Sequence, residues 1–447
     1  MNDYDVIIIG AGIGGLGVAG LLGRKGVKTL VLEKSKMPGG RAKTRDLPGG
    51  WRLDSGTHCV DNGDQSAAAQ LLKKVGKEIP WTIPLEGVNL YRDGKWLSSA
   101  DYYNLSDQEK KDMAAFNERF LAMSQDEIDR LDKVSLAQFI KENVTSPKIA
   151  EYFSIIGMIQ STLSKPEIIS AGEFVAIFQE QLRTGKKSGD FGSVKMPLGG
   201  VGTMTRTQAA AAEEAGVKFE YATSVKKVTA SKRGDIKIIT EKAEYSAKRV
   251  VMALPIWDMV KLFSEDDEAL PKGWLKYMKT LVDETSASIG FTLGARKSLF
   301  TEPVYLSGWS IPGVGLPLQI FLHTNFDKTI APPDHMIAFI GACCTPEQAR
   351  DEQFCKETWA KFWGTLQRMF PGLEENVVWK YDGNMVGIDG LGRSPGLTGK
   401  YRPPVFMKEV PGLYFAGDCY TGRGVGMNAA ANSAMLCAEK IISDMGK

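Results

Sequence analysis

Residues 5–35 read DVIIIGAGIGGLGVAGLLGRKGVKTLVLEKS, and this stretch decides the fold of the N-terminal part of the chain. Residues 6–9 form an uninterrupted apolar run, which is typical of a parallel strand buried on both faces. Three glycines follow with the spacing GxGxxG, then a helical pattern and a second apolar run that ends at Glu33. This order predicts a strand, a glycine turn, a helix and a second strand, the unit that binds a dinucleotide.

Each part of this unit has a physical task in holding a dinucleotide. The first glycine permits the tight turn, the second lets the backbone approach a pyrophosphate, and the third lets the helix pack close to the strand. The helix N-terminus faces the phosphate charge, and a carboxylate after the second strand suits the hydroxyls of an adenosine ribose. The residues predicted to bind the cofactor here are Gly10, Gly12, Ile13, Gly14, Gly15, Glu33 and Lys34.

The composition limits the classes of function. A chain of 447 residues predicts two or three domains, and a net charge of +2 with scattered Lys and Arg argues against a nucleic-acid partner. The six cysteines include no CxxC pair and the three histidines show no metal-ligand spacing, so we expect no metal and reduced thiols in a cytoplasmic protein. The longest apolar stretch holds seven glycines between residues 10 and 23, so we expect at most peripheral membrane contact.

The residues after the dinucleotide unit distinguish between cofactors. Residues 33–60 read EKSKMPGGRAKTRDLPGGWRLDSGTHCV, with GGR at 39–41 and DSG at 54–56. Here the chain resembles the FAD-binding oxidoreductases that include flavin amine oxidases, protoporphyrinogen oxidase and the phytoene desaturases. The resemblance implies that Gly40 and Arg41 contact the FAD phosphates and that Gly56, Thr57 and His58 pass the flavin ring. For Arg41, a residue of a surface turn is the alternative.

The C-terminal segment resembles the piece that completes the FAD site in the same superfamily. Residues 413–434 read LYFAGDCYTGRGVGMNAAANSA, and no acidic second strand follows before the end of the sequence. The resemblance implies that Gly417 and Asp418 bind the ribityl or phosphate region. It places Val425, Gly426 and Met427, at the start of a helix, beside the flavin edge where negative charge collects on reduction. Val225 matches the valine that touches the adenine side of FAD, at the end of a strand.

These motifs predict an α/β fold with a Rossmann-like FAD-binding domain and a discontinuous α+β substrate domain. We expect the FAD-binding domain to comprise residues 1–63, 190–262 and 400–447, and the substrate domain residues 64–189 and 263–399. The substrate domain is expected to hold a helical insertion, with helices around 109–123, 136–143, 146–162 and 164–182. Its apolar helix faces are interpreted as core rather than as a membrane anchor. A hairpin around residues 88–98 and four strand-like runs between 286 and 344 predict an antiparallel sheet.

Acid–base candidates are few. His58 follows the DSG motif, and Tyr420 follows Asp418, where amine oxidases carry an aromatic wall; we predict both as catalytic, with ordinary packing as the alternative for each. Amine oxidases also use a lysine on a substrate-domain strand, and residues 285–295 contain none. Residues 324–341, TNFDKTIAPPDHMIAFIG, resemble a stretch typical of phytoene-desaturase-like proteins.

The predicted function is hydride transfer between a substrate carbon and flavin N5, with desaturation or saturation of a C–C bond in an apolar or partly apolar small molecule. An amine oxidase or a protoporphyrinogen-type oxidase is one alternative. A prenyl- or lipid-binding escort protein of the same fold without redox activity is another. No second GxGxxG–acid unit follows residue 60, so we expect O₂, a quinone or a transiently bound nicotinamide as the electron acceptor.

Overall fold

The strand β1 (Val6–Ile9) lies in the middle of a five-stranded parallel sheet with the order β17-β11-β1-β2-β7. The other strands of this sheet are β2 (Thr29–Leu32), β7 (Lys218–Glu220), β11 (Val250–Met252) and β17 (Leu413–Phe415). Three distant parts of the chain therefore meet in one sheet. All four residues of β1 are buried, because helices and loops cover both faces of the sheet. The α/β fold class predicted from the first motif is confirmed.

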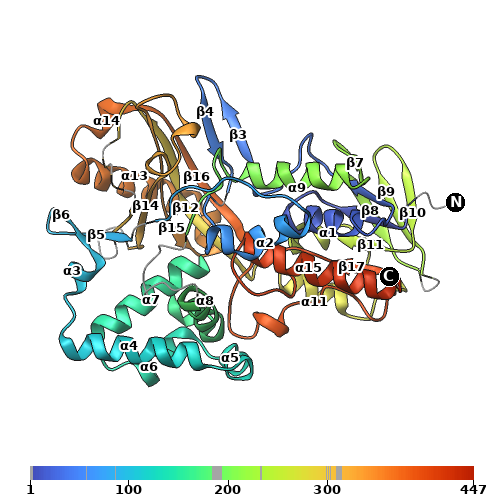
Figure 1. Ribbon diagram of the computed structural model, residues 1–447, viewed down its shortest axis with the longest axis horizontal. Helices are drawn as coiled ribbons and strands as arrows, with labels where there is room; N and C mark the ends of the chain where they lie inside the picture. The colour runs from blue at the N-terminus through green and yellow to red at the C-terminus, as the bar shows by residue number, and fades with distance from the viewer. Residues whose placement is uncertain are drawn as a thin grey trace.

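The computed structural model describes residues 4–446 except 57, 86, 184–193, 232–233, 299, 301, 303 and 309–314. Both ends of the chain lie at the same side of the molecule (Figure 1). The helix α1 (Ile13–Gly23) packs between α9 (Gly202–Glu214) and α15 (Met427–Asp444), and α2 (Ala67–Lys74) packs on α15. Small residues allow this contact: a Cβ on Gly17 would lie 2.9 Å from the Cβ of Ala434.

A second, seven-stranded sheet forms the upper left of Figure 1. It has the order β16-β12-β15-β14-β13-β5-β6 and is antiparallel except where β13 pairs with β5. The antiparallel sheet expected from the sequence is thus confirmed, with one parallel pair added. The bounds are β5 (Val88–Arg92), β6 (Lys95–Ser98), β12 (Thr285–Ala295), β13 (Tyr305–Gly308), β14 (Leu318–Leu322), β15 (Met336–Cys344) and β16 (Val377–Leu391). The helices α12 (Pro346–Arg350), α13 (Glu352–Met369) and α14 (Leu373–Asn376) follow β15.

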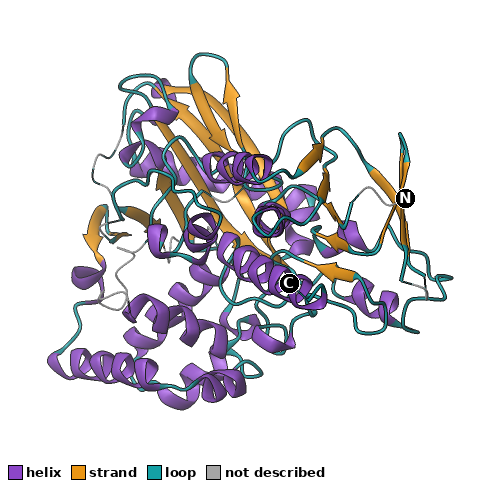
Figure 2. Ribbon diagram, turned by 45° about the vertical axis from the view of Figure 1, so that its right-hand side comes forward, coloured by secondary structure: helices purple, strands orange, loops and turns teal. Residues whose placement is uncertain are grey.

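A helical layer lies below this sheet, and Figure 2 separates it, at the lower left, from the long strands. Its core is aromatic: Phe120, Phe153, Phe174 and Phe178 are buried, with ring centroids 4.5 to 6.2 Å apart. Within the described part of the chain, no helix is long and apolar enough to cross a membrane. The bounds are α3 (Ser99–Tyr103), α4 (Asp107–Ala122), α5 (Gln125–Leu131), α6 (Leu136–Asn143), α7 (Pro147–Ser161) and α8 (Ala171–Arg183).

Some sequence expectations need correction. The strand expected to end at Val225 is wrong: β7 ends at Glu220, and Val225 begins β8 (Val225–Thr229). That strand belongs to a separate three-stranded sheet with β9 (Ile236–Thr240) and β10 (Glu244–Ala247). The helix expected from residue 164 begins only at Ala171, after a 3₁₀ turn. The domain boundaries stay a prediction. One helix of the expected substrate domain, α11 (Trp274–Thr280), packs through Leu275 and Met278 into the same hydrophobic core as β1.

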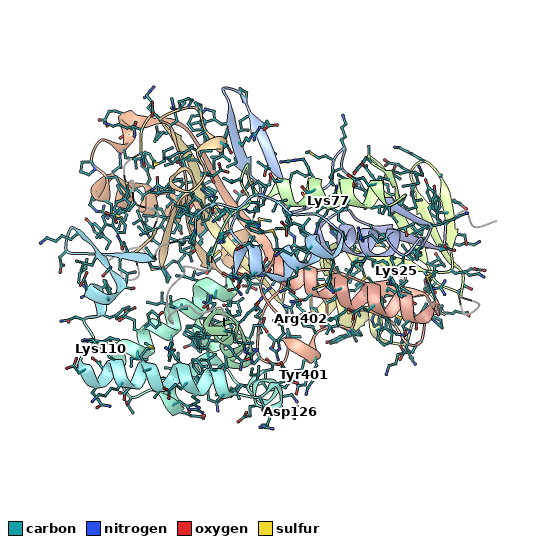
Figure 3. All side chains as sticks on the ribbon, viewed as in Figure 1. Lys25, Lys77, Lys110, Asp126, Tyr401 and Arg402 are labelled. Carbon is teal, nitrogen blue, oxygen red and sulfur yellow. The ribbon has the colours of Figure 1, made fainter. Side chains whose placement is uncertain are left out.

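A buried ion cluster joins the helical layer to the loop that precedes α15. The guanidinium of Arg423 contacts carboxylate oxygens of Asp132 at 2.7 Å, Asp129 at 2.9 Å and Glu173 at 3.0 Å. Asp132 and Glu173 have side chains 0% and 3% exposed, so their charges depend on this partner. Figure 3 shows Tyr401 and Arg402 on the segment that runs between the helical layer and the loop before α15, with Asp126 of α5 nearby.

Removal of the Arg423 guanidinium tests the weight of this cluster. We expect Arg423→Ala to lower the free energy of unfolding by about 3–5 kcal/mol, because it leaves two buried carboxylates without a cation. The matched control is Lys440→Ala, which removes a partly exposed ion pair with Asp444 and is expected to cost less than about 1 kcal/mol. Urea denaturation measures both; equal losses would contradict the assignment.

Candidate active site

The turn between β1 and α1 forms a cradle for phosphate groups. Gly12 is the N-cap of α1 and makes no side-chain cap bond, so the first N–H groups of the helix are available to a ligand. A Cβ on Gly12 would meet nothing within 4 Å, whereas a Cβ on Gly15 would lie 2.0 Å from the carbonyl oxygen of Gly10. Gly15 thus permits the helix to pack on the strand, and Gly12 leaves room for a pyrophosphate.

Glu33 lies beside this cradle, at the end of β2. It is 6% exposed, and its carboxylate accepts hydrogen bonds from the N–H groups of Ala11 and Ser35, each 2.8 Å long. These bonds hold the acid in place next to the glycine turn, as a ribose-binding carboxylate requires. Lys34 instead points to the surface, where it pairs with Asp258 at 3.2 Å.

Arg41 connects the N-terminal motifs to the C-terminal segment. Its Nη2 lies 2.6 Å from Oδ1 of Asp418, and its Nη1 donates to the carbonyl oxygens of Gly387 and Ile388 at 2.9 and 3.2 Å. Arg41 lies in a turn, but its side chain is only 28% exposed and is held by these contacts, and its contact with FAD stays a prediction. The pair brings together two residues predicted to hold the phosphate and ribityl region, and a Cβ on Gly417, next to Asp418, would again meet nothing within 4 Å.

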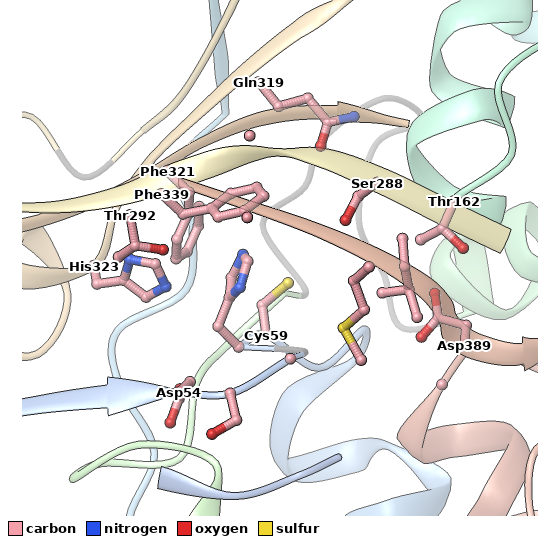
Figure 4. A pocket seen from close by; sticks show the side chains of 18 of the residues that line it. Asp54, Cys59, Thr162, Ser288, Thr292, Gln319, Phe321, His323, Phe339 and Asp389 are labelled. Atoms are coloured by element: carbon pink, nitrogen blue, oxygen red, sulfur yellow. The ribbon is translucent and has the colours of Figure 1, made fainter. Parts of the chain in front are cut away.

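A cavity of about 490 Å³ lies where the seven-stranded sheet, the helical layer and the start of α15 meet. Figure 4 shows His323 and Thr292 on one side of it, Asp389 and Thr162 on the opposite side, and Phe321 and Phe339 above. The described residues that line it include no lysine. Its apolar lining comprises Leu53, Val60, Leu85, Ile159, Val194, Phe291, Phe321, Ile330, Ile337, Phe339, Ala342, Met385, Ile388, Val425 and Met427.

Two histidines form one polar wall of the cavity. The rings of His58 and His323 are in contact, with centroids 4.6 Å apart, and both rings contact Phe321. Burial lowers the pKa of His58 to about 4. Burial, together with the neighbouring His58, lowers the pKa of His323 well below its usual range. Both imidazoles are therefore neutral at neutral pH.

Four carboxyl groups line other parts of the cavity, and one of them, Asp382, belongs to an exposed residue. Burial raises the pKa of Asp54 to about 7, although its carboxylate accepts a hydrogen bond of 2.5 Å from Thr44. Burial and Glu180 raise the pKa of Asp61 to about 6. Asp389 lies against the N-terminus of α15, because a Cβ on Gly426 would be 2.6 Å from its Oδ1. The cavity can thus hold or move a proton at carboxyl oxygens as well as at imidazole nitrogens.

The structure brings most predicted flavin-side residues together. Gly56, His58, Val425, Gly426 and Met427 all line the cavity. Thr57 lies outside the described residues. That these residues contact FAD, and that Val225 touches its adenine side, remain predictions.

The prediction of Tyr420 as a catalytic residue is wrong, because the side chain lies in the hydrophobic core and not in the cavity. Its side chain is 0% exposed, its ring stacks on Phe415 with centroids 5.2 Å apart, and its hydroxyl lies 3.4 Å from the carbonyl oxygen of Leu254. It does not belong to the cavity lining. The segment after Asp418 turns back into the core before α15 begins, so Tyr420 is a core side chain.

Two cavity residues were not expected from the sequence. No motif of the sequence singles out His323, yet it follows β14 on the same face as Phe321, since alternate strand residues share a face. That alternation was the available signal. Asp389 lies in β16, a strand that was not predicted at all.

A glycine cradle, a buried acid beside it and a cavity where the seven-stranded sheet, the helical layer and the start of α15 meet are features of a dinucleotide-dependent oxidoreductase fold. Comparison with known proteins identifies the family within this class. Residues 13–442 match the model of the flavin-containing amine oxidoreductase family, and the chain belongs to that family. Its cofactor is FAD, and the open space at Gly12 and Gly417 together with the Glu33 carboxylate fits that cofactor.

Several relatives and solved structures are similar over the whole chain. The prolycopene isomerase of Daucus carota is 25% identical over 100% of this chain and 81% of its own. A flavin-containing amine oxidase of Oncorhynchus mykiss is 23% identical over 100% of this chain and 87% of its own. The crystal structure of an oxidoreductase from Methanosarcina mazei superposes with a TM-score of 0.78 at 22% identity, over 99% of this chain and 100% of its own.

Substitution of Gly15 tests the cradle. We expect Gly15→Ala to purify with less than about a tenth of the FAD bound by the wild type, because the added methyl group forces α1 away from β1. The control is Gly364→Ala in α13, where the nearest atom is the end of a flexible arginine at 3.8 Å. The ratio of flavin to protein absorbance measures both, and full FAD content in Gly15→Ala would refute the cradle.

The neutral state of His58 predicts a pH dependence of stability. Between its ordinary pKa of 6.5 and about 4, the unfolded chain binds a proton at this residue that the folded chain does not. The free energy of unfolding therefore falls as the pH drops through this window. Asp54 has the opposite effect on the free energy of unfolding, because burial raises its pKa to about 7. The contribution of His58 is therefore measured by comparing the wild type with a variant that lacks this histidine.

We expect His58→Gln to lose less stability than the wild type when the pH falls from about 6.5 to about 4. Urea denaturation of the FAD-loaded proteins across this range measures the difference. Parallel pH profiles for the two proteins would contradict the assigned protonation state.

Proposed function

We propose that this protein is an FAD-dependent oxidoreductase that adds or removes hydrogen across a C–C bond of an apolar or partly apolar small molecule. The observation that carries the proposal is the cavity: its lining is dominated by aromatic and aliphatic side chains, and no lysine is present among the described lining residues. Bound FAD supplies hydride chemistry at N5, while the protein supplies position, dryness and charge.

The chain's own residues have distinct tasks in this proposal. The phenylalanines Phe291, Phe321 and Phe339 exclude water and hold the hydrocarbon part of the substrate. His58 and Asp54 can give or take the proton that accompanies hydride movement, His58 through a ring nitrogen and Asp54 through a carboxyl oxygen. The N-terminus of α15, at Gly426, stabilises negative charge that develops beside it. O₂, a quinone or a nicotinamide is the proposed electron acceptor.

The names of relatives agree with a polyene or isoprenoid substrate without specifying it. The Daucus carota relative is named a prolycopene isomerase. A second match, 48% identical over 13% of this chain, is named an inactive all-trans-retinol 13,14-reductase from Danio rerio. Identities near 25% over the full length support the chemistry of the cofactor more strongly than any one reaction.

Amine oxidation is the second candidate, and one observation favours it. Asp61 and Asp389 line the cavity, and either carboxylate could pair with a substrate ammonium group. An escort protein without redox activity is the remaining alternative. Failure of the purified protein to show flavin absorbance after addition of FAD would revive it.

Anaerobic spectroscopy distinguishes the first two candidates. We expect isoprenoid polyenes, or their dihydro forms, to change the oxidation state of the bound flavin and to give products that differ by one H₂ in mass. Simple primary amines are expected to leave the flavin oxidised and to yield no peroxide in air. Stoichiometric peroxide with an amine panel, and no response to polyenes, would overturn the proposal in favour of an amine oxidase.

A further inference from the structure

The two cavity histidines lie in an aromatic box made of His58, His323, Phe321 and Phe339. Ring centroids of His58 lie 4.6 Å from His323, 4.9 Å from Phe321 and 5.3 Å from Phe339. Phe321 also contacts His323 edge-on at 4.7 Å. The box therefore holds both imidazoles in fixed orientations at one side of the cavity, opposite Asp389 (Figure 4).

His323 has unused hydrogen-bonding capacity in this box. The residue is 5% exposed and lines the cavity, and its Nδ1 is buried without a hydrogen-bond partner among the described residues. A buried polar atom without a partner loses its hydration and gains no hydrogen bond in return, so native structures rarely keep one without a purpose. A bound molecule that brings a small polar group into the box, with a modest turn of the ring, would remove this cost.

The charges around the box select the kind of polar group. Both imidazoles are neutral near pH 7, because burial lowers the pKa of each ring, so together they offer N–H donors and nitrogen acceptors but no net charge. Arg45, Arg52, Tyr381 and Asp382 also line the cavity, but all four residues are exposed to solvent. The other, less exposed ionisable groups of the lining are the thiols of Cys59 and Cys343 and three carboxyls, those of Asp54, Asp61 and Asp389. These carboxyls would repel a substrate carboxylate, and an ammonium group would move toward them and away from the box.

We propose that the His58–His323 box binds a neutral oxygen function, a hydroxyl or carbonyl group, at one end of an otherwise hydrocarbon substrate. The box is then a specificity element: it sets which end of the molecule enters first and which C–C bond lies beside the start of α15. The inference rests on the proposed function in taking this cavity as the substrate site. It concerns binding only, so it can be tested without turnover.

Matched isoprenoid ligands test the box. The FAD-loaded protein is titrated anaerobically with farnesol, farnesene, farnesoic acid and farnesylamine, and the shift of the flavin absorbance gives each Kd. We expect the alcohol to bind about threefold to tenfold more tightly than the hydrocarbon, because one buried hydrogen bond has an effect of that size, and more tightly than the acid or the amine. In His323→Phe the alcohol and hydrocarbon are expected to bind within about twofold of each other.

The matched control is His335→Gln, which replaces the histidine that contacts Trp51 outside the box, and it should keep the full preference for the alcohol. His323→Asn, which retains a polar group, should keep part of it and serves if the phenylalanine variant loses FAD. Equal affinities of the wild type for alcohol and hydrocarbon, or an unchanged preference in His323→Phe, would overturn the inference. A retained preference for the alcohol without any polyene redox activity would instead overturn the proposed function alone.

Discussion

The parallel pairing of β1 with β11, and of β11 with β17, is the constraint on which the rest of the structure depends. It forces residues near 8, 251 and 414 into neighbouring positions, so the intervening chain must leave the sheet and return to it. The excursions become the helical layer and the seven-stranded sheet. The cavity forms where these two parts meet the start of α15, and for this reason its lining is drawn from segments that lie far apart in the sequence, between residues 45 and 428.

The sequence predicted the elements with strong local signals. The dinucleotide unit, the hairpin at β5 and β6 and the helix α7, with Ser146 at its N-cap, needed no tertiary information. β16 was missed because its outer half is exposed at a sheet edge and carries Asp382, Gly383 and Asn384, residues that normally mark turns. α5 was missed because seven residues give too short a periodic pattern. The surroundings of Tyr420 and His323 could not be predicted, because whether a side chain faces a core or a cavity depends on packing between distant segments.

Four buried or partly buried arginines hold the loop between β17 and α15, residues 416–426, in place. Besides Arg41 and Arg423, Arg393 is wholly buried and donates from Nε and Nη2 to the carbonyl oxygen of Gly424 at 3.1 and 3.0 Å. Arg402 donates to the carbonyl oxygens of Asp418 and Leu391. A glycine-rich loop has little rigidity of its own. These guanidinium groups supply it, and they leave the backbone free to approach a flat ring system.

The position of β17 and α15 in the chain has a consequence for biosynthesis. The last strand of the parallel sheet and the helix that packs on α1 are made of residues 413–444. During translation these residues emerge after those of the other four strands of the parallel sheet, so that sheet cannot be completed until they have left the ribosome. The helical layer, which is continuous in sequence from residue 99 to 183 apart from short turns, can form long before. Completion of the parallel sheet is therefore a late step compared with formation of the helical layer.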